Sequence, residues 1–221
     1  MSKPVFYYHP LSPPARSVVM VARENNIDID LKVIDFVNGE HTSEYFTKIN
    51  PAQTIPALVD GDVMICDSQA ICLYLIEKFA KNDYLYPKNN FLLRSVINER
   101  LFFNASFLFP RGYNIFYPVI MQGKSDVPQE RIDQVHRGYR ILETYLTKSK
   151  WVASNEQMTV ADLAIFAWME SMVQCFTTEQ YPNINAWMTE MRKLSYYEDT
   201  NKKGADQHIQ IFKNALEKNK K

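Results

Sequence analysis

The spacing of apolar residues along the chain changes from short strand-like patterns to long helical repeats near residue 82. In the first part, residues 5–8 are rich in aromatic side chains and predict a short strand. Residues 29–33 alternate strictly between apolar and polar positions, as a half-buried strand does. Between them, residues 14–26 place Val18, Val19 and Ala22 at helical spacing. This order predicts a βαβ unit with a right-handed crossover.

A hairpin is predicted further along the first part. Residues 57–59 and 63–66 flank the dipeptide Asp60-Gly61, which is a strong signal for a tight turn between antiparallel strands. Pro56 opens the first of these strands, a position where proline is allowed, and its peptide bond is a candidate for the cis form.

A helix is predicted after the hairpin, because Asp67 and Ser68 provide suitable N-cap residues. Its apolar side carries Ile71, Tyr74, Leu75, Ile76 and Phe79. Residues 35–50 are polar and lack a clear period, so they predict an irregular connection. The full order of elements predicts an α/β thioredoxin-like domain over residues 1–81, with a small mixed sheet and helices on both faces.

The second part predicts an all-α helical-bundle domain. Residues 82–90 look like a linker, and residues 91–221 contain helical repeats without a convincing strand. Thr159-Val160-Ala161-Asp162 is a capping-box signature, and residues 163–176 after it are apolar nearly all round, which places that helix at the bundle's centre. The other predicted helices cover residues 93–108, 128–146, 183–194 and 205–215.

Composition narrows the classes of function. The chain has 221 residues, and its 25 basic and 25 acidic residues cancel, so we expect no strong attraction to nucleic acid or an anionic membrane. No apolar run reaches the roughly 18 to 20 residues of a membrane span. The three cysteines are odd in number and form no C-x-x-C motif, which indicates a cytoplasmic setting. No metal-ligand cluster and no phosphate-cradling glycine loop is recognisable.

Ser12 lies at the junction between the first strand and the first helix. The unpaired N–H groups and the dipole of a helix N-terminus favour an anion there. The simpler interpretation is that Ser12 only caps the helix ahead of Pro13 and Pro14, which suit a first turn. Taken alone, the sequence around Ser12 favours the interpretation as a helix cap.

Two further junctions of the first domain carry groups that complement a small peptide. The turn of residues 53–56 exposes backbone groups that can pair with an extended chain. The Asp67 carboxylate can hold an amine, and the Ser68 hydroxyl with the helix N-terminus can hold a carboxylate. In a thioredoxin-like sheet these junctions can converge with Ser12 at one edge. The matching ligand is a small peptide with an amine and a carboxylate at one end.

Motifs along nearly the full length resemble those of cytosolic glutathione transferases, within the insect delta and epsilon classes and closer to epsilon. The motifs are Ser12-Pro13-Pro14-Ala15-Arg16-Ser17, Gly39-Glu40-His41, Asn50-Pro51, Thr54-Ile55-Pro56, Asp67-Ser68-Gln69-Ala70-Ile71, Leu85-Tyr86-Pro87-Lys88, Gly123-Lys124-Ser125-Asp126-Val127-Pro128, Thr159-Val160-Ala161-Asp162-Leu163 and Leu194-Ser195-Tyr196-Tyr197-Glu198. They occur in the family's order, which makes the match specific.

The resemblance implies glutathione as co-substrate and no metal. Ser12 would be the catalytic residue, whose hydroxyl hydrogen-bonds the glutathione sulfur and favours the thiolate over a thiol of ordinary pKa about 8.5. The implied glutathione-binding residues are Ser12, His41, Gln53, Thr54, Ile55, Asp67, Ser68 and Gln69. Among them Ile55 would pair with the cysteinyl unit and His41 would reach the glycyl carboxylate. Gln53 departs from the family, which usually has histidine there, and it cannot carry a charge.

The resemblance also implies a pocket for an apolar electrophile against the helical domain. The aromatic run at residues 107–117 corresponds to the family's hydrophobic-substrate helix, and Pro110 and Gly112 are expected to bend or interrupt it. The expected lining residues are Leu11, Pro14, Phe36, Tyr113, Phe116 and Tyr117. Any one of them is about as well explained as core between the domains.

The implied activity is attack of the thiolate on hydrophobic electrophiles by a homodimer that serves detoxification. Conjugation, elimination from a chlorinated compound and reduction of an organic hydroperoxide all remain open. Two alternatives are a non-catalytic carrier of hydrophobic ligands such as steroids and a dedicated steroid-pathway transferase.

Other residues could replace Ser12 in the chemistry. Tyr7 or Tyr8 could donate the hydroxyl, although neighbouring strand residues face opposite sides and one ring is then core. A thiol oxidoreductase is disfavoured, because Ser12-Pro13-Pro14-Ala15 stands where a C-x-x-C motif would lie. Cys66 is better explained as a buried strand cysteine.

Overall fold

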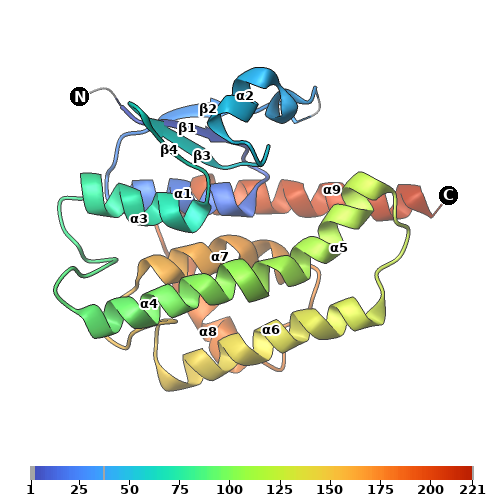
Figure 1. Cartoon of the computed structure of the whole chain (residues 1–221). Helices are drawn as coiled ribbons and strands as arrows, with labels where there is room; N and C mark the ends of the chain where they lie inside the picture. Colours follow the sequence, from blue (N-terminus) through green and yellow to red (C-terminus); the bar gives the residue numbers. More distant parts are fainter. Residues whose placement is uncertain (1–2, 37, 221) are drawn as a thin grey trace.

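A four-stranded mixed sheet forms the first half of the chain in this computed structural model, which describes residues 3–36 and 38–220 (Figure 1). The strand order is β2-β1-β3-β4. β1 pairs in parallel with β2 and antiparallel with β3, and β3 and β4 form the hairpin. The strand bounds are Val5–Tyr8 for β1, Asp30–Val33 for β2, Ala57–Asp60 for β3 and Val63–Ile65 for β4. This arrangement confirms the thioredoxin-like prediction.

Helices cover both faces of the sheet. α1 (Pro13–Glu24) and α3 (Ser68–Phe79) lie on the face toward the helical part, while α2 (Glu44–Ile49) covers the opposite face (Figure 1). The prediction of an irregular connection at residues 35–50 was wrong, since it contains α2 and the short 3-10 helix Glu40–Thr42. The Ser43 hydroxyl caps α2 by accepting a hydrogen bond from the backbone N–H of Phe46 at 3.1 Å.

The second predicted strand is less buried than its alternating pattern indicated. All four residues of β2 are exposed in the chain, with 54% of the Val33 side chain accessible. β2 is an edge strand with β1 as its one neighbour in the sheet, and the buried position follows it at Ile34. Alternation alone therefore overestimated the burial of an edge strand.

The second half of the chain is helical within the described residues. The helices are α4 (Phe91–Phe103), α5 (Phe109–Gln122), α6 (Gln129–Lys148), α7 (Val160–Met172), α8 (Pro182–Met191) and α9 (Lys203–Asn219). All thirteen residues of α7 are buried, and its capping box is formed by Thr159 and Asp162, as the sequence predicted. The stretch between Phe79 and Phe91 holds no described helix or strand.

α4 and α5 form one bent rod rather than two helices separated at Pro110. A π-helical turn, Asn104–Leu108, joins them, and Pro110 lies in the first turn of α5 (Figure 1). The irregularity therefore precedes Pro110, and it does not occur at Gly112. Gly112 is needed for packing, since a Cβ there would lie 2.4 Å from the Trp168 ring.

One large core joins the two halves. It combines residues of β1, α1 and α3 with residues of α4 to α9. A second, smaller core lies between the sheet and α2 and includes Tyr7, Phe46 and Ala57. Among the described residues, no helix has both the length and the apolar character that crossing a membrane requires.

Candidate functional site

Ser12 is the N-cap of α1, and its hydroxyl can still donate one hydrogen bond. The Ser12 Oγ atom accepts a hydrogen bond from the backbone N–H of Ala15 at 3.4 Å. An oxygen that accepts in this way keeps its own hydrogen for another acceptor. Ser12 is half-buried, so the hydroxyl can act both as a cap and as a donor to a bound group.

The N-terminus of α1 differs from the expected cluster of unpaired N–H groups. Pro13 and Pro14 have no N–H, and the Ala15 N–H is already bonded to Ser12. The next donor, the Arg16 N–H, bonds to the Ser12 carbonyl at 3.0 Å. An anion at this helix end can therefore interact with the helix dipole and with the Ser12 hydroxyl. None of the residues 13–16 has a free backbone N–H to donate to it.

The turn between β1 and α1 is held from within by His9. The backbone N–H of Ser12 donates to the His9 carbonyl at 2.9 Å. The backbone N–H of Leu11 donates to the His9 imidazole Nδ1 at 3.2 Å. Both bonds fix the path of the chain immediately before the Ser12 hydroxyl.

Arg16 holds the same turn from the helical half. Its guanidinium is fully buried and donates to the carbonyls of Pro10 at 3.2 Å and Leu11 at 3.0 Å. It also donates to Ser171 Oγ at 2.8 Å and to Asn201 Oδ1 at 2.8 Å.

The Arg16 guanidinium remains the charged form at neutral pH. Burial lowers its pKa to about 9, and the opposing charges of Glu170 and Asp206 limit the fall. A buried cation thus joins the turn to α7 and to the segment before α9, and motif comparison did not predict this role.

Gly204, in the first turn of α9, packs directly against the turn. A Cβ at this position would lie 2.2 Å from the Pro10 carbonyl oxygen and 2.8 Å from Arg16 Cδ. The backbone of α9 therefore lies so close to the turn that any side chain larger than that of glycine would force one of them to shift. Sequence reasoning missed Gly204 because its neighbour in space is almost the whole chain away.

The second predicted junction is a tight turn before a cis peptide bond. Ile55-Pro56 is cis, which agrees with the sequence expectation. The Asn50 side chain donates to the Thr54 carbonyl at 2.6 Å and so holds the turn. The backbone groups of Ile55 enter none of the turn or ladder hydrogen bonds of the described residues, which leaves them available to an extended peptide.

Gln53 takes part in the same turn. Its backbone has a φ of 56°, in the left-handed region, and its amide Nε2 donates to Thr47 Oγ1 at 3.0 Å. The side chain is therefore oriented by α2, and one amide hydrogen remains for a ligand.

The third junction is the N-terminus of α3. One carboxylate oxygen of Asp67 accepts from the N–H groups of Gln69 at 2.8 Å and Ala70 at 3.1 Å. Asp67 is exposed, so its second oxygen can meet an amine. Ser68 is buried, and its hydroxyl accepts from Gln69 Nε2 at 3.4 Å. The Gln69 Oε1 atom is buried without a partner.

His41 lies on the 3-10 helix after β2 and stacks on Phe36. The ring centroids are 4.3 Å apart with an interplanar angle of 26°. The ring centroids of Phe36 and His9 are 6.2 Å apart, and the two rings are nearly perpendicular, with an interplanar angle of 86°. The three rings therefore connect the His41 segment to the turn that carries Ser12.

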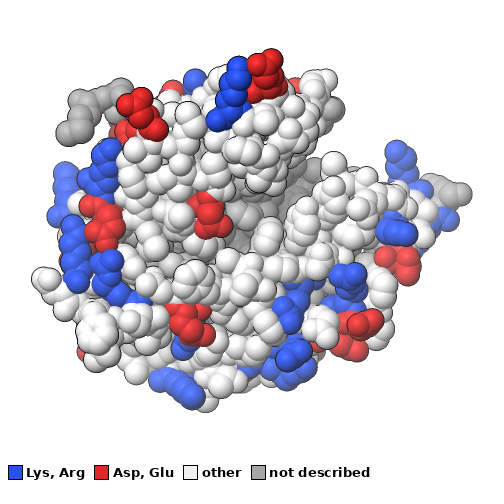
Figure 2. Space-filling view, in the orientation of Figure 1, with Lys and Arg blue, Asp and Glu red and all other residues white. Residues whose placement is uncertain are grey.

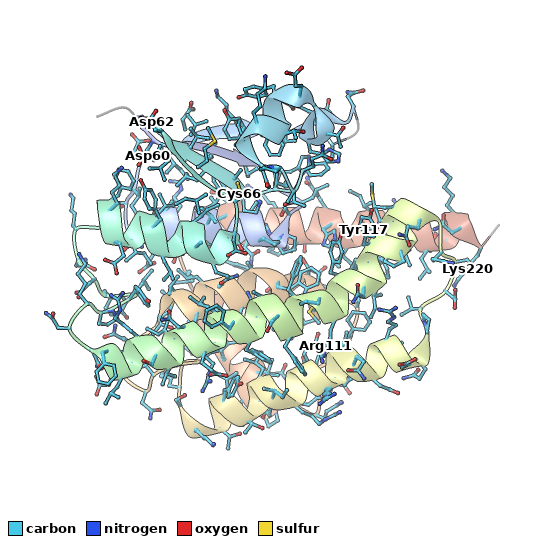
Figure 3. All side chains as sticks on the ribbon, viewed as in Figure 1. Asp60, Asp62, Cys66, Arg111, Tyr117 and Lys220 are labelled. Atoms are coloured by element: carbon cyan, nitrogen blue, oxygen red, sulfur yellow. The ribbon has the colours of Figure 1, made fainter. Side chains whose placement is uncertain are left out.

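The α1 and α3 N-termini open toward one hollow. Figure 2 shows this hollow between the lobe that carries α2 and the lobe that carries α5, with few charged side chains on its walls. Cys66, one residue before Asp67, lies at its upper side, and Tyr117 projects from α5 across from it (Figure 3). Arg111 points away from the hollow, toward α6 (Figure 3).

The predicted pocket residues divide into two groups. Tyr113 and Tyr117 are partly exposed and stack at 5.1 Å, and Phe109 continues this row. Leu11, Pro14 and Phe36 are half-buried around the Ser12 turn. Phe116 differs from the expectation, because it is 2% exposed and packs against Trp168 and Phe212 in the core.

The residues that could compete with Ser12 lie in different surroundings. The Tyr7 hydroxyl is bonded to the Tyr45 hydroxyl at 2.5 Å, and burial together with this bond raises the pKa of Tyr7 to about 12. The Tyr8 ring stacks on Phe6 at 5.7 Å. Burial raises the pKa of the Cys66 thiol, whose sulfur donates to the Ile49 carbonyl, so Cys66 is no activated nucleophile.

Metal chemistry has no visible basis in the described part of the chain. Residues 3–36 and 38–220 contain no group of three or more His, Cys, Asp or Glu side chains that could hold an ion.

Comparison with known proteins matches both halves of the chain. The family model described as "Glutathione S-transferase, N-terminal domain" matches residues 6–83, and "Glutathione S-transferase, C-terminal domain" matches residues 102–194. "Glutathione S-transferase 1" of Manduca sexta is 36% identical over 199 residues, which cover 88% of this chain and 90% of that protein.

Two solved structures show the same fold at similar identity. A glutathione transferase homolog from Drosophila mojavensis with bound glutathione superposes with a TM-score of 0.93 at 34% identity, covering 97% of this chain and 98% of that one. An epsilon-class glutathione S-transferase from the housefly, Musca domestica, superposes with a TM-score of 0.92 at 34% identity, covering 96% and 98%.

Proposed function

Because this chain belongs to the glutathione S-transferase family, we propose that it activates the glutathione thiol through the Ser12 hydroxyl. The observation that carries this assignment is the Ala15 N–H bond to Ser12 Oγ, which leaves the hydroxyl hydrogen for the sulfur. A donated hydrogen bond and the positive end of α1 stabilise the thiolate over the thiol, so the pKa of bound glutathione falls. The thiolate is the attacking species.

The other two junctions would bind the rest of glutathione. The Asp67 carboxylate holds the γ-glutamyl amine, and Ser68 with Gln69 holds its carboxylate. The unpaired Gln69 Oε1 atom is an acceptor and supports the amine of the ligand at this end. Ile55 pairs its backbone with the cysteinyl unit, next to Thr54. His41 and Gln53 face the glycyl carboxylate.

The second substrate would be a hydrophobic electrophile in the hollow beside α5. The row of aromatic rings at Tyr113 and Tyr117 supports this choice, together with the apolar Leu11, Pro14 and Phe36 around the turn. The reaction is conjugation, with the sulfur displacing or adding to the electrophilic carbon. We place this epsilon-type activity in the cytosol, which the three free cysteines support.

We propose that the active form is a homodimer. The outer side of α4 exposes Phe91 (72%) and Phe102 (71%), and β4 exposes Val63 and Met64. Large apolar side chains exposed to this degree support an interface between two copies of the chain. Sedimentation of the native chain and of Phe102→Glu tests this; a native monomer contradicts it.

One experiment separates the enzyme from a carrier of hydrophobic ligands. Glutathione conjugation to 1-chloro-2,4-dinitrobenzene is measured for the native chain and for Ser12→Ala, and the thiolate absorbance of bound glutathione is titrated in both. We expect activity and a lowered thiol pKa in the native chain, and loss of both in Ser12→Ala. A native chain that binds glutathione without turnover, or a fully active Ser12→Ala variant, overturns the proposal.

A further inference from the structure

His9 supplies both acceptors that the turn before Ser12 requires. Pro10 has no N–H, so the chain from Pro10 to Ser12 contains two backbone donors, on Leu11 and Ser12. The Ser12 N–H is bonded to the His9 carbonyl and the Leu11 N–H to the His9 Nδ1 atom. The carbonyls of the turn are satisfied separately by Arg16. The imidazole is therefore the side-chain partner that completes this turn.

The bond from Leu11 also fixes the proton on the imidazole. Nδ1 can accept a hydrogen bond when it carries no hydrogen, so the single proton of the neutral ring is on Nε2. The ring packs nearly perpendicular to Phe36, with the centroids 6.2 Å apart, and Phe36 is held in turn by its stack on His41. This packing opposes rotation of the ring away from Leu11.

We propose that His9 is a positioning residue, which holds the Ser12 hydroxyl against the glutathione sulfur by accepting the Leu11 N–H on the Nδ1 atom of its neutral ring. The inference rests on the proposed function of Ser12. Its consequence is that losing the acceptor lowers the turnover step, while the contacts that bind the ends of glutathione stay in place.

Protonation of His9 would remove the acceptor. An imidazolium carries hydrogens on both nitrogens, so Nδ1–H would face the Leu11 N–H and the bond would be lost. Burial lowers the pKa of His9, and the Asp35 carboxylate opposes this shift. Three further charged or titratable groups belong to the elements packed against the ring: Arg16 donates to the Leu11 carbonyl, Glu40 accepts from the Asp35 N–H, and His41 stacks on Phe36. The ring is therefore neutral at pH 7, and the bond is lost as the pH falls below the ordinary histidine range.

Two variants separate the acceptor from the ring. His9→Phe keeps an aromatic ring against Phe36 without an acceptor. His9→Asn offers an oxygen that can accept from the N–H two residues ahead, as in an Asx turn. We expect kcat of His9→Phe to fall about tenfold, the effect of one lost hydrogen bond, with KM for glutathione nearly unchanged. The thiol pKa of bound glutathione rises by about one unit in that variant. His9→Asn recovers most of both losses.

The pH profile provides the second readout. The ratio of kcat for the native enzyme to kcat for His9→Asn is measured at saturating glutathione from neutral pH downward. Because His9→Asn recovers most of the thiol pKa, ionisation of the thiol nearly cancels in this ratio. We therefore expect the ratio to fall in acid as His9 becomes protonated. A ratio independent of pH, or a His9→Phe variant with native kcat, overturns the proposal.

A direct test does not depend on the variants folding. The 15N chemical shifts of the His9 ring in the native enzyme report its protonation, and we expect hydrogen on Nε2 and a hydrogen-bonded, bare Nδ1. Hydrogen on Nδ1 at neutral pH contradicts the inference. This result is independent of the Ser12→Ala rate, so failure of the Ser12 assignment and failure of the His9 assignment are distinguishable.

Discussion

The N-termini of α1 and α3 both open toward the hollow, but they leave different groups for a ligand. At α1, two prolines remove two N–H groups and the N-cap hydroxyl accepts the third. At α3, a carboxylate caps the Gln69 and Ala70 N–H groups, and the Ser68 N–H precedes them without a partner among the described residues. One helix end presents a single hydroxyl donor, and the other presents a carboxylate and a backbone donor.

The two ends are also supported differently. The α1 turn is packed into the helical half by Arg16, Gly204 and Asn201. Asp67 is exposed at the edge of its own domain. A rigid end suits a group that must act on one reacting atom, and an exposed end suits charge recognition. The difference predicts that changes at α1 affect kcat and changes at α3 affect KM for glutathione.

The largest effect is expected at Ser12. Ser12→Ala removes the one donor at the α1 end, and losing such a donor lowers kcat about 10²- to 10³-fold. KM for glutathione should change little, because the α3 end is intact. Steady-state kinetics with Ser12→Thr as the hydroxyl-retaining control measures this; equal losses in both variants would show that packing, not the hydroxyl, matters.

A smaller effect is expected at Asp67, and it should appear in KM for glutathione instead of in kcat. Asp67→Asn keeps an oxygen for the cap and removes the charge that faces the amine, so KM for glutathione should rise about tenfold or more with kcat retained. Asp67→Ala removes the cap as well and should lower the free energy of unfolding by about 1 kcal/mol. Kinetics and denaturant unfolding of the pair separate the two roles. An unchanged KM in both variants rules out the amine contact.

Gly204→Ala tests the support of the α1 turn. The added Cβ must displace the Pro10 carbonyl, and such overpacking costs about 1–3 kcal/mol of stability. We expect kcat to fall several-fold through Ser12 while KM for glutathione is retained. Gly138→Ala is the matched control, since its Cβ meets the flexible Leu108 side chain at 2.9 Å, away from the turn. A loss of kcat that is as large in Gly138→Ala assigns the effect to general destabilisation.

The smallest effect is expected from Pro14→Ala, which gives the N-terminus of α1 a backbone N–H donor like the one at the N-terminus of α3. Pro14→Ala restores one N–H at the helix end, and a favourable contact of an anion with a helix N-terminus contributes about 0.3–1 kcal/mol. We expect the thiol pKa of bound glutathione to fall by a few tenths of a unit. Titration of the thiolate absorbance measures it. A raised pKa would show that the proline ring, rather than the missing donor, tunes the site.

Local signals in the sequence predicted much of the fold. The capping box at Thr159 and Asp162, the hairpin after residues 57–59 and the cis bond before Pro56 are determined by neighbouring residues, and all three are present. The hairpin turns at Gly61-Asp62, one residue later than predicted, because Asp60 is still paired with Val63. α2 was missed because its six residues are too short to establish a helical period. β2 was called half-buried because alternation does not tell an edge strand from a central one.

The sequence allowed the junction residues of the candidate site to be selected, but it did not reveal the distant residues that support them. Ser12, Ile55 and Asp67 were selected at element junctions, and the structure places all three there. Arg16 was a motif residue without a role, because its partners Ser171 and Asn201 are more than 150 positions away. Phe116 was expected in the pocket because it belongs to the aromatic run that corresponds to the family's hydrophobic-substrate helix, and that resemblance does not tell which rings of the run face the core.

The burial of Arg16 has a consequence for synthesis. Asn201, which accepts a hydrogen bond from the Arg16 side chain, is synthesised 185 residues after Arg16. At roughly 5–20 residues per second, the turn waits on the order of ten seconds or more for its support. During that interval the nascent chain has Ser12 without the buried hydrogen bond between Arg16 and Asn201, so the turn gains its full support only once Asn201 has been made.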